Sequence, residues 1–209
     1  MVDRRTQKKR LLRSDLLAAA RALIAERDGP RFNADDLAAR ADVARRTVFN
    51  HFANVDQVVI ELCEEDLAAL IEDFDVQMAS RAAAVDTIGD LYQLIAAALR
   101  HTDFVAAIAS IFRLLGRPGV TDTRAAAIRH LAEQRVTTRL ADRAIDRYPG
   151  LDPVRTALLA GAAMNGVGVI AARWVEETGA VDTIRSRTRW HDLLQTLLDG
   201  LEHGHSGTH

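Results

Sequence analysis

The chain has 209 residues, of which 48% are hydrophobic and 27% are charged, and its formal net charge is −2 at pH 7. This is enough apolar material for one or two packed domains, and the single cysteine, Cys63, excludes an internal disulfide. There is no uncharged apolar run of about 18 residues or more and no apolar signal-peptide core, so we expect a cytoplasmic protein without a membrane partner.

Positive charge gathers at the N-terminal end of the chain. Residues 1–51 hold 12 Lys and Arg against 7 Asp and Glu, which leaves 15 against 22 for the remaining residues. A first helix is predicted at about residues 7–27, and a basic arm leads into it: Arg4, Arg5, Lys8, Lys9, Arg10 and Arg13. By itself such a run is most often a solvated terminus, but it also favours binding to a polyanion through counterion release.

Residues 32–59 contain the signals of two short helices that meet at a tight turn and are followed at once by a third helix. Asn33 can cap a helix, with Asp36 at the capping-box position three residues later. Asp42 is a residue type that tolerates a left-handed turn, so this helix should end there. Asn54 is predicted to cap the third helix. This arrangement is typical of a helix-turn-helix that reads DNA.

The second short helix is predicted at residues 45–51, with Val48 and Phe52 facing inward. The remaining side chains point outward and are all hydrogen-bond formers: Arg45, Arg46, Thr47, Asn50 and His51. We expect Arg45 or Arg46 to read guanine and Asn50 to bind adenine or a phosphate. Thr47 and His51 would contact the DNA backbone or a thymine methyl, although His51 could equally be a structural histidine.

This segment resembles the N-terminal domain of the TetR-type (tetracycline-repressor-like) transcriptional regulators. Leu37, Ala38, Ala41 and Val43 match an LA-x-x-A-x-V turn, and Thr47, Phe49, His51 and Phe52 match a T-x-Y/F-x-H-F recognition helix. The likeness covers about the first 60 residues. Four positions depart from the family pattern, because Asp42, Ala44, Phe49 and Val55 stand where Gly, Ser, Tyr and Lys are usual.

The resemblance implies a helix-turn-helix DNA-binding domain at residues 1–54 and a helical regulatory domain at residues 55–209. It also implies a homodimer that represses transcription from an operator and is released when a small effector shifts the fourth helix. Since two polar anchors of the family are missing, phosphate contacts should come from Arg45, Arg46 and the basic arm. We therefore add further predicted DNA contacts: Asn33, Phe49, Arg4, Arg5, Lys8 and Lys9.

The rest of the sequence is predicted to be helical, which makes the fold class all-α with about nine helices. The expected spans are about 55–79, 84–101, 103–115, 122–147, 153–177 and 184–201. Residues 116–119 and 148–150 contain the glycines and prolines of turns, and Asp152 should cap a helix with Pro153 at its first position. Residues 204–209 are expected to form an untethered tail.

The helix at residues 154–174 is apolar all round and carries a stripe of small side chains, which invites close approach of another helix. This can be a tightly packed interior helix of one subunit. The interpretation that we favour is a two-fold dimer in which this helix and the last one form a four-helix interface. Its predicted residues are Ala157, Gly161, Asn165, Gly168, Ala172, Leu194 and Leu197.

The family resemblance implies an effector cavity between the middle helices. The candidate lining residues are Tyr92, Ile95, Ile108, Phe112, His130, Gln134 and Met164, of which His130 and Gln134 could also lie on solvated faces. The low aromatic content, 5%, favours a mostly aliphatic effector over a large flat one.

Other classes of protein find little support in the sequence. There is no glycine-rich phosphate loop, no G-x-S-x-G and no H-E-x-x-H, so we expect neither an enzyme nor a cofactor or metal. The alternative function is a helical adaptor that binds protein and has only nonspecific affinity for DNA.

Overall fold

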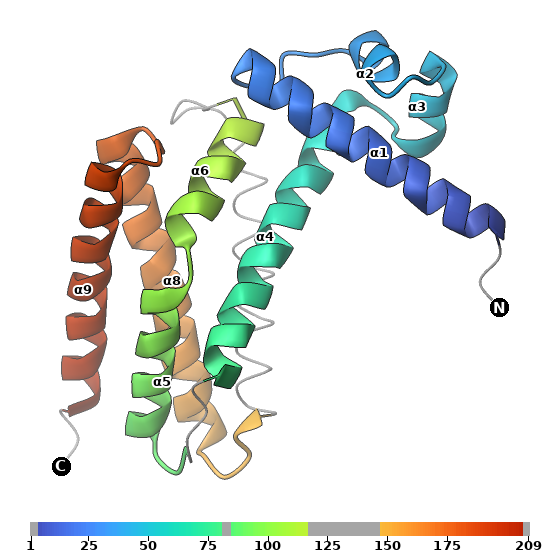
Figure 1. Ribbon diagram of the computed structural model, residues 1–209. Coiled ribbons are helices and arrows are strands. Elements are labelled where there is room, and N and C mark those ends of the chain that lie inside the picture. The colour runs from blue at the N-terminus through green and yellow to red at the C-terminus, as the bar shows by residue number, and fades with distance from the viewer. Residues whose placement is uncertain (1–3, 81–84, 117–146, 207–209) are drawn as a thin grey trace. The chain divides into compact units, whose positions relative to one another are not determined.

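The computed structural model describes residues 4–80, 85–116 and 147–206, and in these ranges it contains helices and no strand (Figure 1). The helices are α1 (Arg4–Arg27), α2 (Ala34–Arg40), α3 (Arg45–His51), α4 (Val55–Ser80), α5 (Ile88–His101), α6 (Phe104–Leu114), α8 (Pro153–Thr178) and α9 (Ile184–Ser206). The predicted all-α fold class is confirmed. The predicted helix at 122–147 and the turn after Gly116 lie almost wholly outside the described residues.

The chain forms two compact units. Unit 1 consists of Met1–Asp66 and Ser110–Ala125, and unit 2 consists of Leu67–Ala109 and Ala126–His209. Both α4 and α6 therefore begin in one unit and end in the other. The predicted functional boundary after residue 54 stays a prediction, because this division follows packing and not function.

Unit 1 is built around one stripe of α1, on which Leu16, Ala20 and Ile24 are buried at a helical spacing. The buried partners of this stripe come from the three helices that follow: Leu37, Val48, Phe52, Val58 and Leu62. Polar contacts add to this core. Asp66 on α4 pairs with Arg21 of α1 at 2.7 Å and accepts a hydrogen bond from Ser110 of α6 at 2.6 Å.

Unit 2 is held together by α5, α8 and α9. The ring nitrogen of Trp174, which is fully buried, donates a hydrogen bond to the carbonyl oxygen of Ser186 at 2.7 Å. Trp190 of α9 meets Trp174 edge to face and stacks on Phe104 of α6. Buried aromatic pairs of this kind contribute about 0.5–1.5 kcal/mol beyond the area that they bury. The first turn of α9 is thereby fixed to α8.

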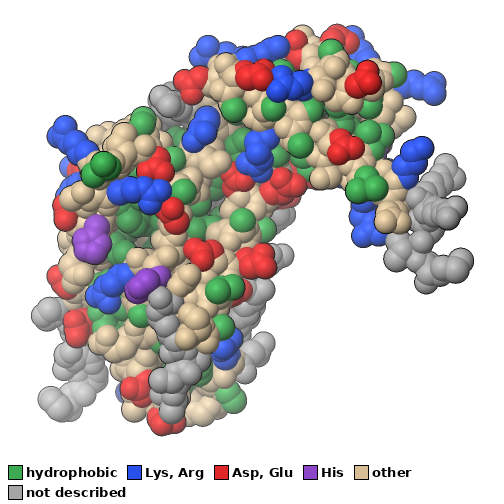
Figure 2. All heavy atoms as spheres, in the orientation of Figure 1, with side chains coloured by type: hydrophobic (Ala, Val, Ile, Leu, Met, Phe, Trp, Pro, Cys, Tyr) green, Lys and Arg blue, Asp and Glu red, His purple; other side chains and the backbone are tan. Residues whose placement is uncertain are grey.

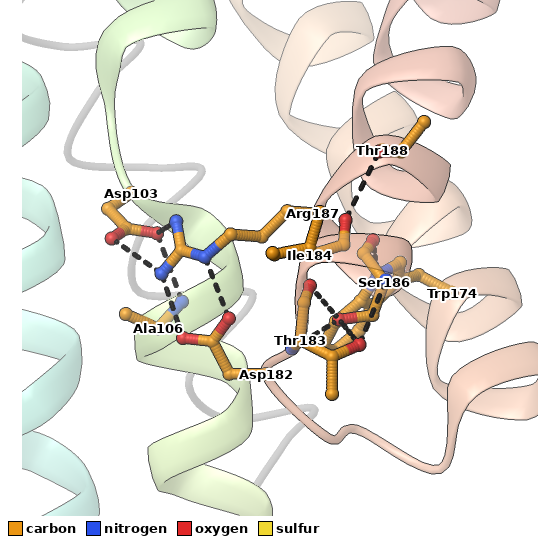
Figure 3. Close-up of polar contacts among 9 residues, drawn as sticks. All are labelled: Asp103, Ala106, Trp174, Asp182, Thr183, Ile184, Ser186, Arg187 and Thr188. Atoms are coloured by element: carbon orange, nitrogen blue, oxygen red, sulfur yellow. Dashed lines mark hydrogen bonds and ion pairs between the residues drawn. The ribbon is translucent and has the colours of Figure 1, made fainter.

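An exposed ion-pair network lies beside this aromatic cluster (Figure 3). Arg187 of α9 pairs with Asp182 at 2.7 Å and with Asp103 at 3.1 Å. Asp103 also accepts a hydrogen bond from the backbone N–H of Ala106, in the first turn of α6. One arginine thus joins the start of α6 to the start of α9. Hydrogen bonds to Asp182 and Asp103 raise the pKa of Arg187 above its ordinary value.

Several predicted helix ends need correction. α1 already begins at Arg4, and α5 begins at Ile88 and not near residue 84. Its N-terminus is set by a capping box in which Thr87 and Asp90 exchange hydrogen bonds, a signal that the sequence contained. α9 continues through Ser206, so residues 204–206 are helical and do not belong to a tail.

Among the described helices, α8 has the length and hydropathy of a membrane span. α5 and α6 together also meet these two criteria, but as a pair of helices bent by 56°. Only 28% of the apolar window of α8 is buried in this chain. The apolar character of α8 therefore exceeds what packing within unit 2 requires.

Candidate nucleic-acid interface

The turn between α2 and α3 is fixed by local hydrogen bonds. The side chain of Asn33 accepts from the backbone N–H groups of Asp35 and Asp36, and Asp36 accepts in return from the N–H of Asn33 at 2.9 Å. Asp42 has a φ of 52°, and the N–H of Val43 donates to the carbonyl of Ala38 at 3.0 Å. The predicted cap and the predicted left-handed turn residue are both confirmed.

α3 presents two chemically different faces. Val48 is buried against the core of unit 1, whereas Arg45, Arg46 and Asn50 are exposed and Thr47 is half-buried. Phe49 is 47% exposed, so an aromatic ring lies on the same outer face as the polar side chains. The exposed side of α3 can offer hydrogen-bond donors and acceptors to a ligand and one apolar surface beside them.

Arg45 is partly engaged within unit 1. A terminal nitrogen of its guanidinium lies 3.0 Å from a carboxylate oxygen of Asp35, at the start of α2, and the guanidinium carbon lies 5.6 Å from the centre of the Phe49 ring. Both members of the ion pair are mostly exposed, and such pairs contribute about 0–1 kcal/mol. A DNA phosphate or guanine can therefore compete for this arginine at little cost.

His51 differs from the outward-facing residue that the sequence predicts. It is half-buried, and its Nδ1 is buried without a hydrogen-bond partner among the described residues. Burial lowers the pKa of His51, and the charges of Lys9 and Arg13 lower it further. The lowered pKa favours the neutral ring, which works against a cationic role of His51 toward phosphate.

The basic arm divides into exposed and inward-facing members. Lys8, Lys9 and Arg10 are exposed along the first half of α1, and Lys and Arg side chains are spread over α1–α3 in Figure 2, with Asp and Glu between them. Arg4 and Arg5 lie at the start of α1, but their side chains fall outside the described residues.

Arg13 does not belong with the exposed members of the arm. It pairs with Glu61 and donates a hydrogen bond to the carbonyl oxygen of His51. This contact was not predicted from the sequence. The signal was present in the spacing, since Arg13 lies three residues before Leu16 and seven before Ala20 and so falls on the buried stripe of α1.

Asn54 caps α4 as predicted, and Gln57 adds a second bond at the start of this helix. The side chain of Asn54 accepts from the N–H of Gln57 at 2.8 Å, whereas the side chain of Gln57 accepts from the N–H of Ala53 at 2.7 Å. The start of α4 is thereby tied to the end of α3.

The predicted effector-binding residues are spread over both units. Tyr92 and Ile95 are buried in unit 2, where the Tyr92 hydroxyl donates to the carbonyl of Leu198 at 2.9 Å. Ile108 and Met164 of unit 2 and Phe112 of unit 1 are half-buried. His130 and Gln134 lie outside the described residues.

The predicted dimer residues divide in a similar way. Asn165 and Ala172 are exposed on α8, Ala157 is half-buried, and Gly161 and Gly168 would meet nothing within 4 Å if each carried a Cβ. The two leucines of α9 are engaged within the chain. Leu194 is buried, and Leu197 lies where a Cβ on Gly166 would stand, at 2.1 Å.

In the part of the chain that the structure describes, no group of three or more His, Cys, Asp or Glu side chains is placed to hold a metal ion. The interface chemistry described above is that of arginine, lysine, amide and aromatic side chains. These are groups that contact phosphates and base edges.

Comparison with known proteins agrees with this geometry. A sequence model of the bacterial regulatory proteins of the tetR family matches residues 16–62, and no curated protein matches the chain. A solved structure from Mesorhizobium loti, assigned to the TetR-family transcriptional regulators, is 14% identical, covers 92% of this chain and 96% of its own, and has a TM-score of 0.60.

The fatty acid degradation regulator FadR from Bacillus halodurans is 20% identical, with 91% of this chain and 96% of that chain covered and a TM-score of 0.54. At these identities the solved structures show the fold, while the sequence match covers the helix-turn-helix segment. The chain therefore contains a segment, residues 16–62, that is similar to the tetR family of bacterial regulatory proteins, within a fold that is similar to those of solved TetR-family regulators.

Proposed function

We propose that the protein is a transcriptional repressor that binds a palindromic operator as a homodimer and is released by a small apolar effector. The observation that carries the DNA-binding part is the outer face of α3, where Arg45, Arg46 and Asn50 are exposed while Val48 is buried on the opposite side. A capped α2 and the left-handed turn at Asp42 hold this face in place.

Within each half-site, Arg46 or Arg45 reads guanine and Asn50 binds adenine or a phosphate. Thr47 contacts the DNA backbone, and the exposed ring of Phe49 packs on a sugar or a thymine methyl. Lys8 and Lys9 of the arm, with Arg4 and Arg5, supply phosphate contacts. Asn33 contributes by capping α2, because its side-chain oxygen is already occupied by two backbone N–H groups.

The exposed face of α8 supports the homodimer. Val154, Leu158 and Val169 are 65%, 68% and 70% exposed on it, and the open positions of Gly161 and Gly168 lie beside them. Exposed apolar patches of this kind mark interaction sites in soluble proteins. In a two-fold dimer, the two α3 helices would bind half-sites about one helical turn, roughly 34 Å, apart.

The proposed effector is an aliphatic compound. Aliphatic side chains of α5 and α6, with few aromatic ones, favour an acyl or other aliphatic compound, and FadR is by name a regulator of fatty acid degradation. Thermal-shift screening of acyl and terpenoid compounds against polycyclic dyes tests this point. Stabilisation by the dyes alone would contradict it.

The experiment that tests the DNA-binding function is selection of bound duplexes from a random pool, followed by affinity measurements over a range of salt concentrations. A recovered palindrome supports sequence-specific binding, dimer symmetry and half-site spacing together. Steep salt dependence without any sequence preference would support nonspecific adhesion, and the adaptor would then be the better hypothesis.

A further inference from the structure

Arg13 is the member of the basic arm whose surroundings differ from those of its neighbours. Lys8, Lys9 and Arg10 are exposed, whereas the side chain of Arg13 is 31% exposed and contacts residues of two other helices. Its partner Glu61, on α4, is 26% exposed. This is a partly buried ion pair within unit 1, and desolvation makes such a pair stronger and more directional than the exposed pairs elsewhere in this unit.

The guanidinium of Arg13 makes four contacts at once. Its Nε donates to one carboxylate oxygen of Glu61 at 2.7 Å, and a terminal nitrogen donates to the other oxygen. The second terminal nitrogen donates to the backbone carbonyl of His51, and the guanidinium carbon lies 4.1 Å from the centre of the Phe52 ring. A lysine at this position could not satisfy these partners together, since only arginine has a planar fork.

These contacts meet at the C-terminal end of α3. His51 is the last residue of that helix, and its carbonyl is among the four that a helix leaves without an intrahelical partner. The positive charge is also favourable there because of the helix dipole. At the other end, Ala44 offers no side-chain cap, so the contacts of Arg13 add to the buried Val48 and the turn at Asp42 in fixing the orientation of this seven-residue helix.

We propose that Arg13 is a positioning residue for DNA recognition, which holds α3 in the orientation in which Arg46 and Asn50 meet the base edges, and that it makes no contact with DNA phosphates. The inference rests on the proposed DNA-binding function and adds a residue to it. Glu61 contributes to the same positioning, because it fixes the plane of the Arg13 guanidinium.

The salt dependence of binding separates this role from a phosphate contact. Each phosphate contact contributes about 0.9 to the slope of log affinity against log salt concentration, whereas a positioning residue contributes nothing to it. Removal of the Glu61 carboxylate gives a second test, because the two possible effects change the affinity for DNA in opposite directions. Removal of a carboxylate near a DNA-binding surface should strengthen binding by electrostatics alone, but it should weaken binding if Glu61 orients Arg13.

The experiment measures affinity and salt slope for the full chain on the operator recovered by selection. We expect Arg13→Lys, Arg13→Gln and Glu61→Gln each to lower affinity by about tenfold or more, the loss of one charge-assisted hydrogen bond being of that order. The salt slope should be unchanged in Arg13→Gln, which removes the cation. Arg100→Lys, on an exposed position of α5, is the matched control and should bind like the parent. Lys8→Gln gives the slope change expected for loss of one cation of the arm.

A second selection with Arg13→Lys provides a readout that a simple loss of stability would not move. Base preference at the positions read by Asn50 should relax, whereas a smaller folded fraction would leave the preference of the folded molecules unchanged. Circular dichroism confirms that each variant is helical.

A salt slope that falls by about 0.9 in Arg13→Gln would overturn the proposal, and so would tighter binding by Glu61→Gln. These outcomes differ from a failure of the proposed function. In that case the parent chain would itself select no sequence, and the role of Arg13 would fall with it.

Discussion

Arg46 is exposed at the second position of α3, and unlike Arg45 it forms no ion pair within the described residues of unit 1. Its guanidinium is therefore the more available of the two for bidentate contact with guanine. We expect Arg46→Ala to weaken operator binding by about 1–3 kcal/mol, the range found for such contacts. Electrophoretic shift on the selected operator measures this, with Arg100→Ala as control. Equal affinity of Arg46→Ala and the parent would remove Arg46 from the interface.

His51 gives a prediction about pH. Because burial and two nearby cations lower its pKa below the ordinary 6.5, the unfolded chain binds a proton at a higher pH than the folded chain does. The associated stability is fully present above pH 6.5 and is lost as pH falls below 6.5 toward the lowered folded pKa. NMR titration of the His51 ring, assigned by its absence in His51→Gln, should give a midpoint below 6.5, and urea unfolding should show a smaller loss of stability with acid in that variant. A midpoint at or above 6.5 would contradict this.

At the scale of residues, the sequence predicted what neighbours in the chain determine. The cap formed by Asn33 and Asp36 and the left-handed turn at Asp42 depend on contacts within three or four residues. The positions of Arg13 and His51 depend on packing between α1, α3 and α4, which a charge count along the chain does not contain. Arg13, the last residue of the basic run, was therefore predicted to belong to the DNA-binding arm, although its helical spacing places it on the core side of α1.

The end of α6 meets the loop between α1 and α2 within unit 1. Gly116 has a φ of 77°, and a Cβ there would lie 2.9 Å from Cδ of Pro30. We expect Gly116→Ala to destabilise unit 1 by about 1–3 kcal/mol, because both the backbone conformation and the space require glycine. Chemical denaturation measures the change. Gly150→Ala is the matched control, since its Cβ would meet nothing within 4 Å and should alter stability by less than about 1 kcal/mol.

Helix ends were predictable to the extent that their caps are local. Residues 45–51 and the start at Pro153 after the Asp152 cap agree with the structure, because turn and capping residues mark them directly. The start of α5 was placed too early, although Thr87 and Asp90 form a capping box. The apolar residues before Thr87 continue the helical pattern, so periodicity alone extends the helix past its cap.

For the whole molecule, the outer face of α8 is the apolar surface that packing within unit 2 leaves exposed. The inner face is packed within unit 2, where Leu159, Ala163 and Trp174 are buried. The outer face exposes valine and leucine side chains, and glycine costs about 1 kcal/mol relative to alanine inside a helix. Among the described residues, Gly161 and Gly168 have no neighbour that needs the space. A partner helix that approaches closely would explain both the apolar surface and the glycines.

The glycines of α8 allow a test in which stability and association move in opposite directions. Gly161→Ala and Gly168→Ala meet no atom within 4 Å in the chain, so each should stabilise the monomer by about 1 kcal/mol through helix propensity. If a partner helix packs there, the same methyl groups should weaken the dimer, as analytical ultracentrifugation over a range of concentrations would show. Gly166→Ala is the contrasting variant, because its Cβ would meet Leu197 at 2.1 Å and should destabilise the chain itself. A dimer that is unchanged or stronger in Gly161→Ala and Gly168→Ala would show that the partner does not approach along this stripe. A parent chain that sediments only as a monomer at micromolar concentration would contradict the dimer itself.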